Sequence, residues 1–292
     1  MQHQDPLKSA SPADYEIPNH VWTEQLAPDY PTIQLSNSHG TATLALHGAH
    51  VIDYTPKNQE PVLFTSKQAV FKEGKAIRGG IPICWPWFNA HPSDSSLPSH
   101  GYARTQFWNI SSSEHTADHT SITLTLETET LQAQVTITLS ESLEISLKTT
   151  NTSNQTQTIG GALHSYFRIS DILNTTITGL DNTHFIDTLT DTPESQSGDI
   201  SITEETDRIY ENTTATVSIF DSKLNRNIII DKTGSKSTVV WNPWIEKSAS
   251  MGDLGNEEYK EFICIEAANA REDVHQIAPR DSHTLSTKIT SV

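Results

Sequence analysis

Apolar and polar positions alternate along most of the chain. In residues 121–130, SITLTLETET, the apolar side chains are Ile122, Leu124 and Leu126, and threonine lies between them. Residues 133–150 contain two more runs of this kind, separated by a polar turn. A period of two is typical of half-buried antiparallel strands. Similar segments that we predict as strands are 41–48, 175–180, 215–220, 227–232, 237–242, 261–267 and 283–290.

The spacing of the apolar residues favours strands over helices throughout. No window of helical length has a convincing period near 3.6 residues. Many short strands with turn residues between them predict an all-β protein, specifically a large antiparallel β-sandwich. Residues 188–207 are polar, but strand patterns resume after them, so we interpret them as a surface loop rather than a linker. We expect a flexible lead-in over residues 1–14 and one sandwich domain over residues 15–292.

The charge balance limits the possible partners. The chain has 292 residues, with 19 Lys and Arg against 36 Asp and Glu, for a formal net charge of −17. This charge repels nucleic acid and anionic membrane surfaces, so we expect neither as a partner. The sequence shows no secretory signal and no apolar run long enough to span a bilayer, so we expect a cytoplasmic protein. It shows no distinct interface pattern either, and we expect a monomer.

The two cysteines, Cys84 and Cys264, lie inside apolar runs. Two thiols in a chain of this length are typical of a reducing compartment, and we interpret both as small core residues. No group of His, Cys and acidic residues has the spacing of metal ligands along the sequence. We therefore expect no metal and no other cofactor.

Two loop-like segments bring arginine next to glycine and aromatic residues. In residues 76–89, AIRGGIPICWPWFN, Arg78 precedes two glycines that allow a ligand to approach the backbone closely. In residues 97–108, LPSHGYARTQFW, His100 and Arg104 flank a second glycine. A guanidinium pairs bidentately with phosphate or carboxylate, so two arginines can hold one anion. The alternative is that each arginine lies at the surface or pairs with one of the many acidic residues.

Two ionisable residues lie within apolar strand patterns. His164, in IGGALHSYFRISDI, follows two glycines; such a histidine is more often a core residue with satisfied hydrogen bonds. Glu266 ends FICIEA, and burial there would raise its pKa towards the range of a general base. The alternative for Glu266 is a core carboxylate paired with an arginine. Trp241 and Trp244 lie in the preceding segment and suit either a sugar face or the core.

Taken in chain order, these segments resemble one family. The motifs RGGIPICWPWF, HGYAR, ALHSYFRISDI, TDRIY, VVWNPW and ICIEAA span residues 78–268. Together they are similar to the hexose-6-phosphate mutarotases, also called glucose-6-phosphate 1-epimerases, of the aldose 1-epimerase superfamily. The resemblance implies the galactose mutarotase-like β-sandwich, in agreement with the strand pattern.

The resemblance also implies roles for particular side chains. It makes His164 the general acid and Glu266 the general base. Arg78 and Arg104 match residues that bind the substrate and its phosphate, and Asp207 matches a carboxylate that holds sugar hydroxyls. His100 matches the histidine of the HG motif and is expected to line the same pocket. Some members carry glutamine immediately before that histidine; here the residue is Ser99, so we do not assign that contact.

The implied reaction needs only proton transfer. A base removes the proton of the anomeric hydroxyl while an acid protonates the ring oxygen, and reclosure on the other face of the aldehyde gives the other anomer. Histidine and a desolvated glutamate suit these roles, and the substrate is a hexose 6-phosphate. Two other functions remain open: an aldose 1-epimerase for unphosphorylated sugars, which would not need paired cations, and a non-catalytic module that binds sugar phosphates.

Overall fold

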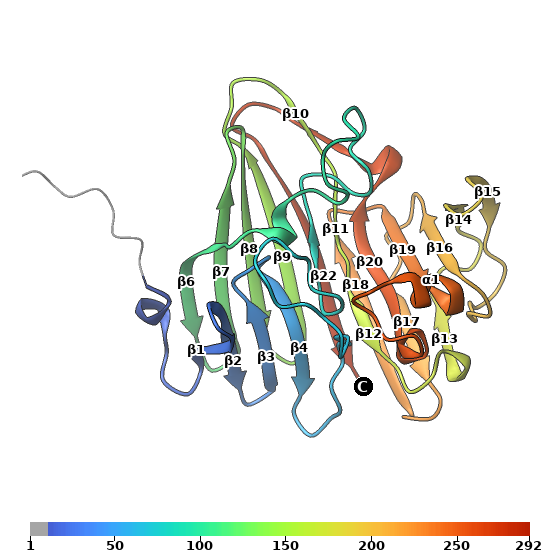
Figure 1. The fold of residues 1–292 in the computed structure, drawn as a ribbon, viewed down its shortest axis with the longest axis horizontal. Helices are drawn as coiled ribbons and strands as arrows, with labels where there is room; N and C mark the ends of the chain where they lie inside the picture. Colours follow the sequence, from blue (N-terminus) through green and yellow to red (C-terminus); the bar gives the residue numbers. More distant parts are fainter. Residues whose placement is uncertain (1–10) are drawn as a thin grey trace, which may run out of the picture.

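The structure, a computed structural model, describes residues 11–292, and its regular secondary structure is mostly antiparallel strands (Figure 1). The predicted β-sandwich is confirmed. One α-helix, α1 (Trp244–Ser250), is present in the described part of the chain, and none of its helices is long and apolar enough to cross a membrane. The predicted lead-in falls mostly outside the described residues, although Pro12–Tyr15 form a 3-10 helix, η1.

Two eight-stranded sheets form the body of the molecule. The first, sheet I, has the order β15-β14-β16-β19-β20-β11-β5, and β12 pairs with β20. Its strands are β15 (Thr192–Ser195), β14 (His184–Asp187), β16 (Thr206–Tyr210), β19 (Ser237–Asn242), β20 (Phe262–Asn269), β11 (Gly161–Leu163), β5 (Ile83–Cys84) and β12 (Tyr166–Arg168).

The second, sheet II, has the order β13-β17-β18-β22-β9-β8-β7-β6. Its strands are β13 (Thr175–Thr178), β17 (Val217–Asp221), β18 (Arg226–Thr233), β22 (Ser282–Ser291), β9 (Leu143–Asn151), β8 (Leu131–Leu139), β7 (Thr120–Glu127) and β6 (Asn109–His115). Buried and partly exposed side chains alternate along β8 and β9, as the sequence period predicts.

Smaller elements complete the layers. A four-stranded sheet contacts sheet II through β7 and β8, and its strands are β1 (Val21–Ala27), β2 (Tyr30–Asn37), β3 (Gly40–Ala45) and β4 (His50–Pro56). A two-stranded sheet joins β10 (Gln157–Ile159) to β21 (His275–Ile277). The remaining 3-10 helices are η2 (Ala103–Thr105), η3 (Ile172–Asn174), η4 (Glu258–Glu261) and η5 (Arg271–Asp273).

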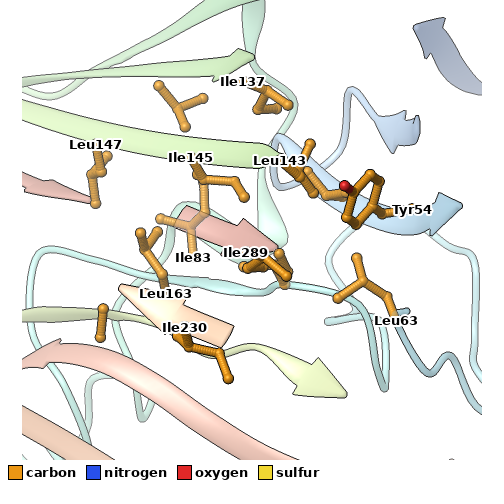
Figure 2. Close-up of a cluster of buried hydrophobic side chains, with 14 of the residues drawn as sticks. Tyr54, Leu63, Ile83, Ile137, Leu143, Ile145, Leu147, Leu163, Ile230 and Ile289 are labelled. Carbon is orange, nitrogen blue, oxygen red and sulfur yellow. The ribbon is translucent and has the colours of Figure 1, made fainter. Parts of the chain in front are cut away.

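The core lies between the sheets. Figure 2 shows Ile83 and Leu163 of sheet I in one cluster with Ile145 and Ile289 of sheet II, and all four side chains are buried. Apolar area removed from water stabilises such a core by roughly 25 cal/mol per Å². Sheet I therefore has one face fixed against sheet II, and its other face is available for a site.

The predicted strands match observed ones closely. Residues 237–242 form β19 as predicted, and the other predicted segments each overlap a strand of the sheets. The interpretation of residues 188–207 as a loop was only partly right, because Thr192–Ser195 form β15 at the edge of sheet I. All four side chains of β15 are exposed, so the strand has no apolar alternation that the sequence could reveal.

Candidate functional site

Strand parity sorts the side chains of β20 onto two faces. Ile263, Ile265 and Ala267 belong to the core between the sheets. Because side chains alternate along a strand, Cys264 and Glu266 lie on the opposite face. Glu266 is nevertheless only 1% exposed, because loops and neighbouring strands cover that face. The sequence-based expectation that this carboxyl group is buried is confirmed.

His164 lies on the same covered face. The register pairs Leu163 with Ala267 and Tyr166 with Cys264, so His164, between β11 and β12, lies beside Glu266 of β20. His164 Nδ1 lies 3.3 Å from Glu266 Oε1. Neither His164 Nδ1 nor Glu266 Oε2 makes a hydrogen bond in the described part of the chain. His164 is thus not a core histidine with satisfied hydrogen bonds, and within residues 11–292 Glu266 has no arginine partner within 4.0 Å.

The surroundings of His164 and Glu266 shift each pKa in the direction that disfavours the charged form of the side chain. Burial raises the pKa of Glu266 well above its ordinary value, and the nearby negative charge of Asp207 raises it further. Burial lowers the pKa of His164, and the positive charges of Arg104 and Arg78 add to this, as does His100. In the unliganded protein the site therefore disfavours a charge on either side chain.

The buried carboxyl leads to a prediction about stability. The folded pKa of Glu266 exceeds its unfolded value of about 4.3, so the folded chain binds more protons above that pH. The stability of the wild type should then fall as pH rises through this window, by about 1.4 kcal/mol for each pH unit between the unfolded and the folded pKa. Glu266→Gln lacks this titration. The free energy of unfolding of Glu266→Gln minus that of the wild type should therefore be larger at pH 8 than at pH 4. Urea unfolding at both pH values measures this difference.

Glu144→Gln supplies the control, because Glu144 is exposed on β9 and should change little at either pH. A Glu266→Gln protein whose stability relative to the wild type is the same at pH 4 and pH 8 would contradict the expected titration.

The loop that carries Arg78 is held tightly against the strands beneath it. Gly79 has φ +108°, and a Cβ there would lie 2.4 Å from the carbonyl oxygen of Phe64. Gly80 has φ +61°, and a Cβ there would lie 2.2 Å from the carbonyl oxygen of Val51. Only glycine tolerates these torsions and this close approach. His50, fully buried below the loop, contacts the Gly79 carbonyl oxygen through Nε2 at 2.7 Å.

The Arg78 guanidinium is oriented by two partners. Its Nε donates to Asp253 Oδ1 at 3.2 Å, and its NH1 donates to Tyr166 Oη at 2.9 Å. Tyr166 in turn stacks on His164, with ring centroids 4.9 Å apart. NH2 makes no hydrogen bond within residues 11–292. Arg78 therefore offers one uncommitted edge next to the His164–Glu266 pair.

Arg104 and His100 lie on the second loop. Arg104, in η2, donates from NH2 to the carbonyl oxygen of Ser99 at 3.0 Å. His100 has φ +65°, and its ring centroid lies 6.1 Å from that of His164. Burial and the charges of Arg104 and Arg78 lower the pKa of His100 to about 3, so its ring is neutral at ordinary pH. Both arginines therefore lower the pKa values of the same two neighbouring histidines, His100 and His164.

Asp207 lies on β16, opposite Trp241 of β19. Burial raises its pKa, and Lys247 of α1 opposes this change. Trp241 in turn pairs with Cys264 of β20, so by strand parity Asp207 lies on the same face of sheet I as Glu266. The structure thus brings together all six residues that the sequence singled out: His164, Glu266, Arg78, His100, Arg104 and Asp207.

The tryptophans separate into two roles. Trp241 lies edge-on to His164, with ring centroids 5.9 Å apart, and forms part of the site wall. Trp244 packs on Tyr259 and against the main core, so it is not on this wall. Nothing in the sequence singles out Asp253, which lies 175 residues from its partner Arg78.

A cavity of about 1000 Å³ adjoins the site. Phe88, Gly160 and Ala270 are among its lining residues. Phe88 also contacts the His100 ring, with centroids 5.0 Å apart, so this aromatic side chain belongs both to the cavity lining and to the surroundings of His100.

Comparison with known proteins adds to this geometry. The family model for aldose 1-epimerase matches residues 31–290. The chain belongs to the aldose 1-epimerase family. The activity that follows from this membership is sugar mutarotation, without a particular sugar being specified. All six site residues lie within the matched range, and so do the strands of both large sheets except for the last residue of β22, Ser291.

Several relatives in the aldose 1-epimerase family cover most of the chain. A protein of Escherichia coli K12 named "Putative glucose-6-phosphate 1-epimerase" is 35% identical over 249 residues, or 83% of this chain and 84% of its own. A protein of Cenchrus ciliaris with the same name is 32% identical and covers 78% of this chain and 74% of its own.

Solved structures agree with the fold. A crystal structure of a "putative mutarotase" from Salmonella typhimurium has a TM-score of 0.88 at 30% identity, covering 95% of both chains. A galactose mutarotase related enzyme from Lactobacillus acidophilus has a TM-score of 0.70 at 14% identity, covering 89% of this chain and 96% of its own. The second match shows the fold alone.

Proposed function

We propose that this member of the aldose 1-epimerase family interconverts the α and β anomers of hexose 6-phosphates, chiefly glucose 6-phosphate. The observation that carries the proposal is the contact of His164 Nδ1 with Glu266 Oε1 at 3.3 Å, in a buried setting influenced by two arginines. The names of the relatives that cover most of the chain point to the same substrate.

In the proposed reaction Glu266 takes the proton of the anomeric hydroxyl and His164 gives a proton to the ring oxygen. The bond between C1 and the ring oxygen breaks, and the electron pair of the anomeric oxygen forms the aldehyde. Rotation of the aldehyde and reclosure on its other face return both protons. The two oxygens share C1 as a neighbour, so an acid and a base in contact can serve both.

The substrate phosphate has a second effect in this proposal. The charges of Arg78 and Arg104 lower the pKa of His164 in the free protein. A phosphate dianion bound between the arginines would neutralise much of this charge, so the pKa of His164 would rise towards its ordinary value. Binding of the phosphate would therefore favour the protonated form of His164, which is the form that must donate a proton to the ring oxygen. Asp207, on the neighbouring strand β16, would hold sugar hydroxyls.

The phosphate is what separates this proposal from an epimerase of free sugars. A neutral sugar has no group that requires two guanidinium groups, whereas a phosphate accepts several charge-assisted hydrogen bonds. The uncommitted NH2 edge of Arg78 supports the phosphorylated substrate. A non-catalytic module would not need an unpaired buried carboxyl beside a histidine, which carries a cost in stability.

Activity measurements test the proposal directly. Purified protein should accelerate the α–β exchange of glucose 6-phosphate, followed by exchange NMR. Free glucose at the same concentration should be converted at a much lower kcat/KM, because the arginines lose their charged partner. Equal values for both sugars would contradict the phosphate specificity, and no acceleration of either would contradict the enzyme itself.

A further inference from the structure

The site contains a third potential ligand atom that proton transfer does not use. A ring nitrogen of His164, Cys264 Sγ and a carboxylate oxygen of Glu266 all lie within 4.8 Å of one another. Cys264 and Glu266 are two residues apart on β20, so their side chains share a face, and His164 lies beside them in the short segment between β11 and β12. The sequence predicted an inert core thiol, and Cys264 is indeed free and buried.

The three donors match the chemistry of one kind of ion. Zinc is bound in proteins by thiolate, imidazole and carboxylate, at about 2.0–2.3 Å, and three protein ligands leave one position open. Ligand atoms at such distances around a tetrahedral ion lie somewhat under 4 Å from one another, and His164 Nδ1 and Glu266 Oε1 are already at 3.3 Å. Because all three donor atoms lie within 4.8 Å of one another, a small movement of the side chains would bring them to these separations.

The donors are also free to bind. Glu266 is 1% exposed and its Oε2 has no hydrogen-bond partner in the described part of the chain, and His164 Nδ1 has none either. Buried polar atoms in folded proteins normally have partners, so two unpartnered atoms on neighbouring side chains indicate a place that a ligand fills. The 12% exposure of the His164 side chain gives solutes a path to this point.

We propose that His164, Cys264 and Glu266 form a binding site for a thiophilic divalent cation such as zinc, and that the bound ion inhibits the enzyme reversibly. Coordination uses the imidazole lone pair and the carboxylate oxygen that proton transfer requires. The thiol proton is released to solvent when the Zn–S bond forms. Zinc and the sugar phosphate therefore compete for the same two side chains.

Neighbouring charges set how strongly the ion is held. Asp207 acts electrostatically on both Glu266 and Cys264, and its negative charge favours a cation. Arg78 and Arg104 oppose it, so the site binds more weakly than a structural zinc site of the same ligands. The softness of the thiolate selects zinc over magnesium, which prefers oxygen ligands.

Cobalt substitution tests the binding separately from any activity. Co²⁺ added to the metal-free protein should produce a near-ultraviolet thiolate-to-cobalt charge-transfer band, because a thiolate coordinates the ion. Cys264→Ser should lose the band. Cys84→Ser, the matched control, should keep it, since Cys84 is the other of the two cysteines and is not one of the three ligands. Absence of the band in the wild type, or its persistence in Cys264→Ser, would overturn the site.

Inhibition tests the consequence. Zinc should inhibit anomer exchange competitively with glucose 6-phosphate, and a chelator should restore the rate. Relative to each variant's own metal-free rate, Cys264→Ser should need at least about tenfold more zinc for half inhibition, because even loss of an outer-shell partner costs 10–100-fold in metal affinity. Equal zinc sensitivity in Cys264→Ser and Cys84→Ser would overturn the inhibitory role. The cobalt band does not depend on the proposed activity, so the two proposals can fail separately.

Discussion

Replacing His164 by asparagine, or Glu266 by glutamine, is expected to lower turnover of glucose 6-phosphate by about 10²–10⁴-fold, the usual contribution of one positioned acid or base. Both changes preserve the shape of the side chain and remove proton transfer. Binding should be largely retained, because Arg78 and Arg104 remain in place. The double variant should lose little more than either single one, since groups that act as a unit are not additive. Exchange NMR gives turnover, and titration with substrate gives binding.

A structural role for the pair makes a different prediction. If His164 and Glu266 served only the core, the variants would lose stability and keep their activity per folded molecule. Circular dichroism and urea unfolding of each variant, measured on the same samples, separate these outcomes. Near-normal turnover in either well-folded variant would refute the acid–base assignment.

The fold could be predicted well because the strands carry a local signal. Along β8 and β9 every second side chain is buried, and this period is visible in the sequence without knowledge of the partners. Short elements carry less of it. β5 has two residues and β15 is exposed throughout, so neither has an alternation to detect.

The resemblance named the candidate site residues one by one, but it could not give their contacts with one another. Parity along β20 places Cys264 and Glu266 on one face, yet only the register with β11 and β12 shows that His164 lies beside them. Contacts of this kind join residues about 100 positions apart. The spacing of metal ligands along the sequence was therefore uninformative about His164, Cys264 and Glu266.

The contact between Asp253 and Arg78 could not be predicted from the sequence either. Asp253 lies in an irregular loop after α1, where no periodicity indicates which way a side chain points. Many acidic residues are present, so a carboxylate partner for an arginine could be expected in general but not identified. Tertiary packing decides which carboxylate pairs with Arg78, because it fixes the position of the Arg78 loop over His50 and β4.

Removing either arginine is expected to weaken recognition of the phosphate. Arg78→Ala or Arg104→Ala should lower kcat/KM for glucose 6-phosphate roughly 5- to 150-fold. This range corresponds to about 1–3 kcal/mol, as for loss of a charge-assisted hydrogen bond. The loss for free glucose should be smaller, because no charged partner is lost. Arg280→Ala is the matched control, since this exposed arginine contacts Asn154 and not the site. If both site variants kept the wild-type preference for the phosphorylated sugar, another cation such as Lys247 would have to hold the phosphate.

The same variants should also move the pH profile with free glucose in a defined direction. The positive charges of Arg104 and Arg78 lower the pKa of His164, and as the proposed acid His164 must be protonated to act. Loss of either charge raises that pKa, so the fall in kcat on the alkaline side should begin at higher pH in each variant than in the wild type. With glucose 6-phosphate the wild type should already show the higher pH limit, because the bound phosphate neutralises the arginines. A limit at the same pH for both sugars in the wild type, unchanged in Arg78→Ala and Arg104→Ala, would show that the phosphate does not control the proton on His164.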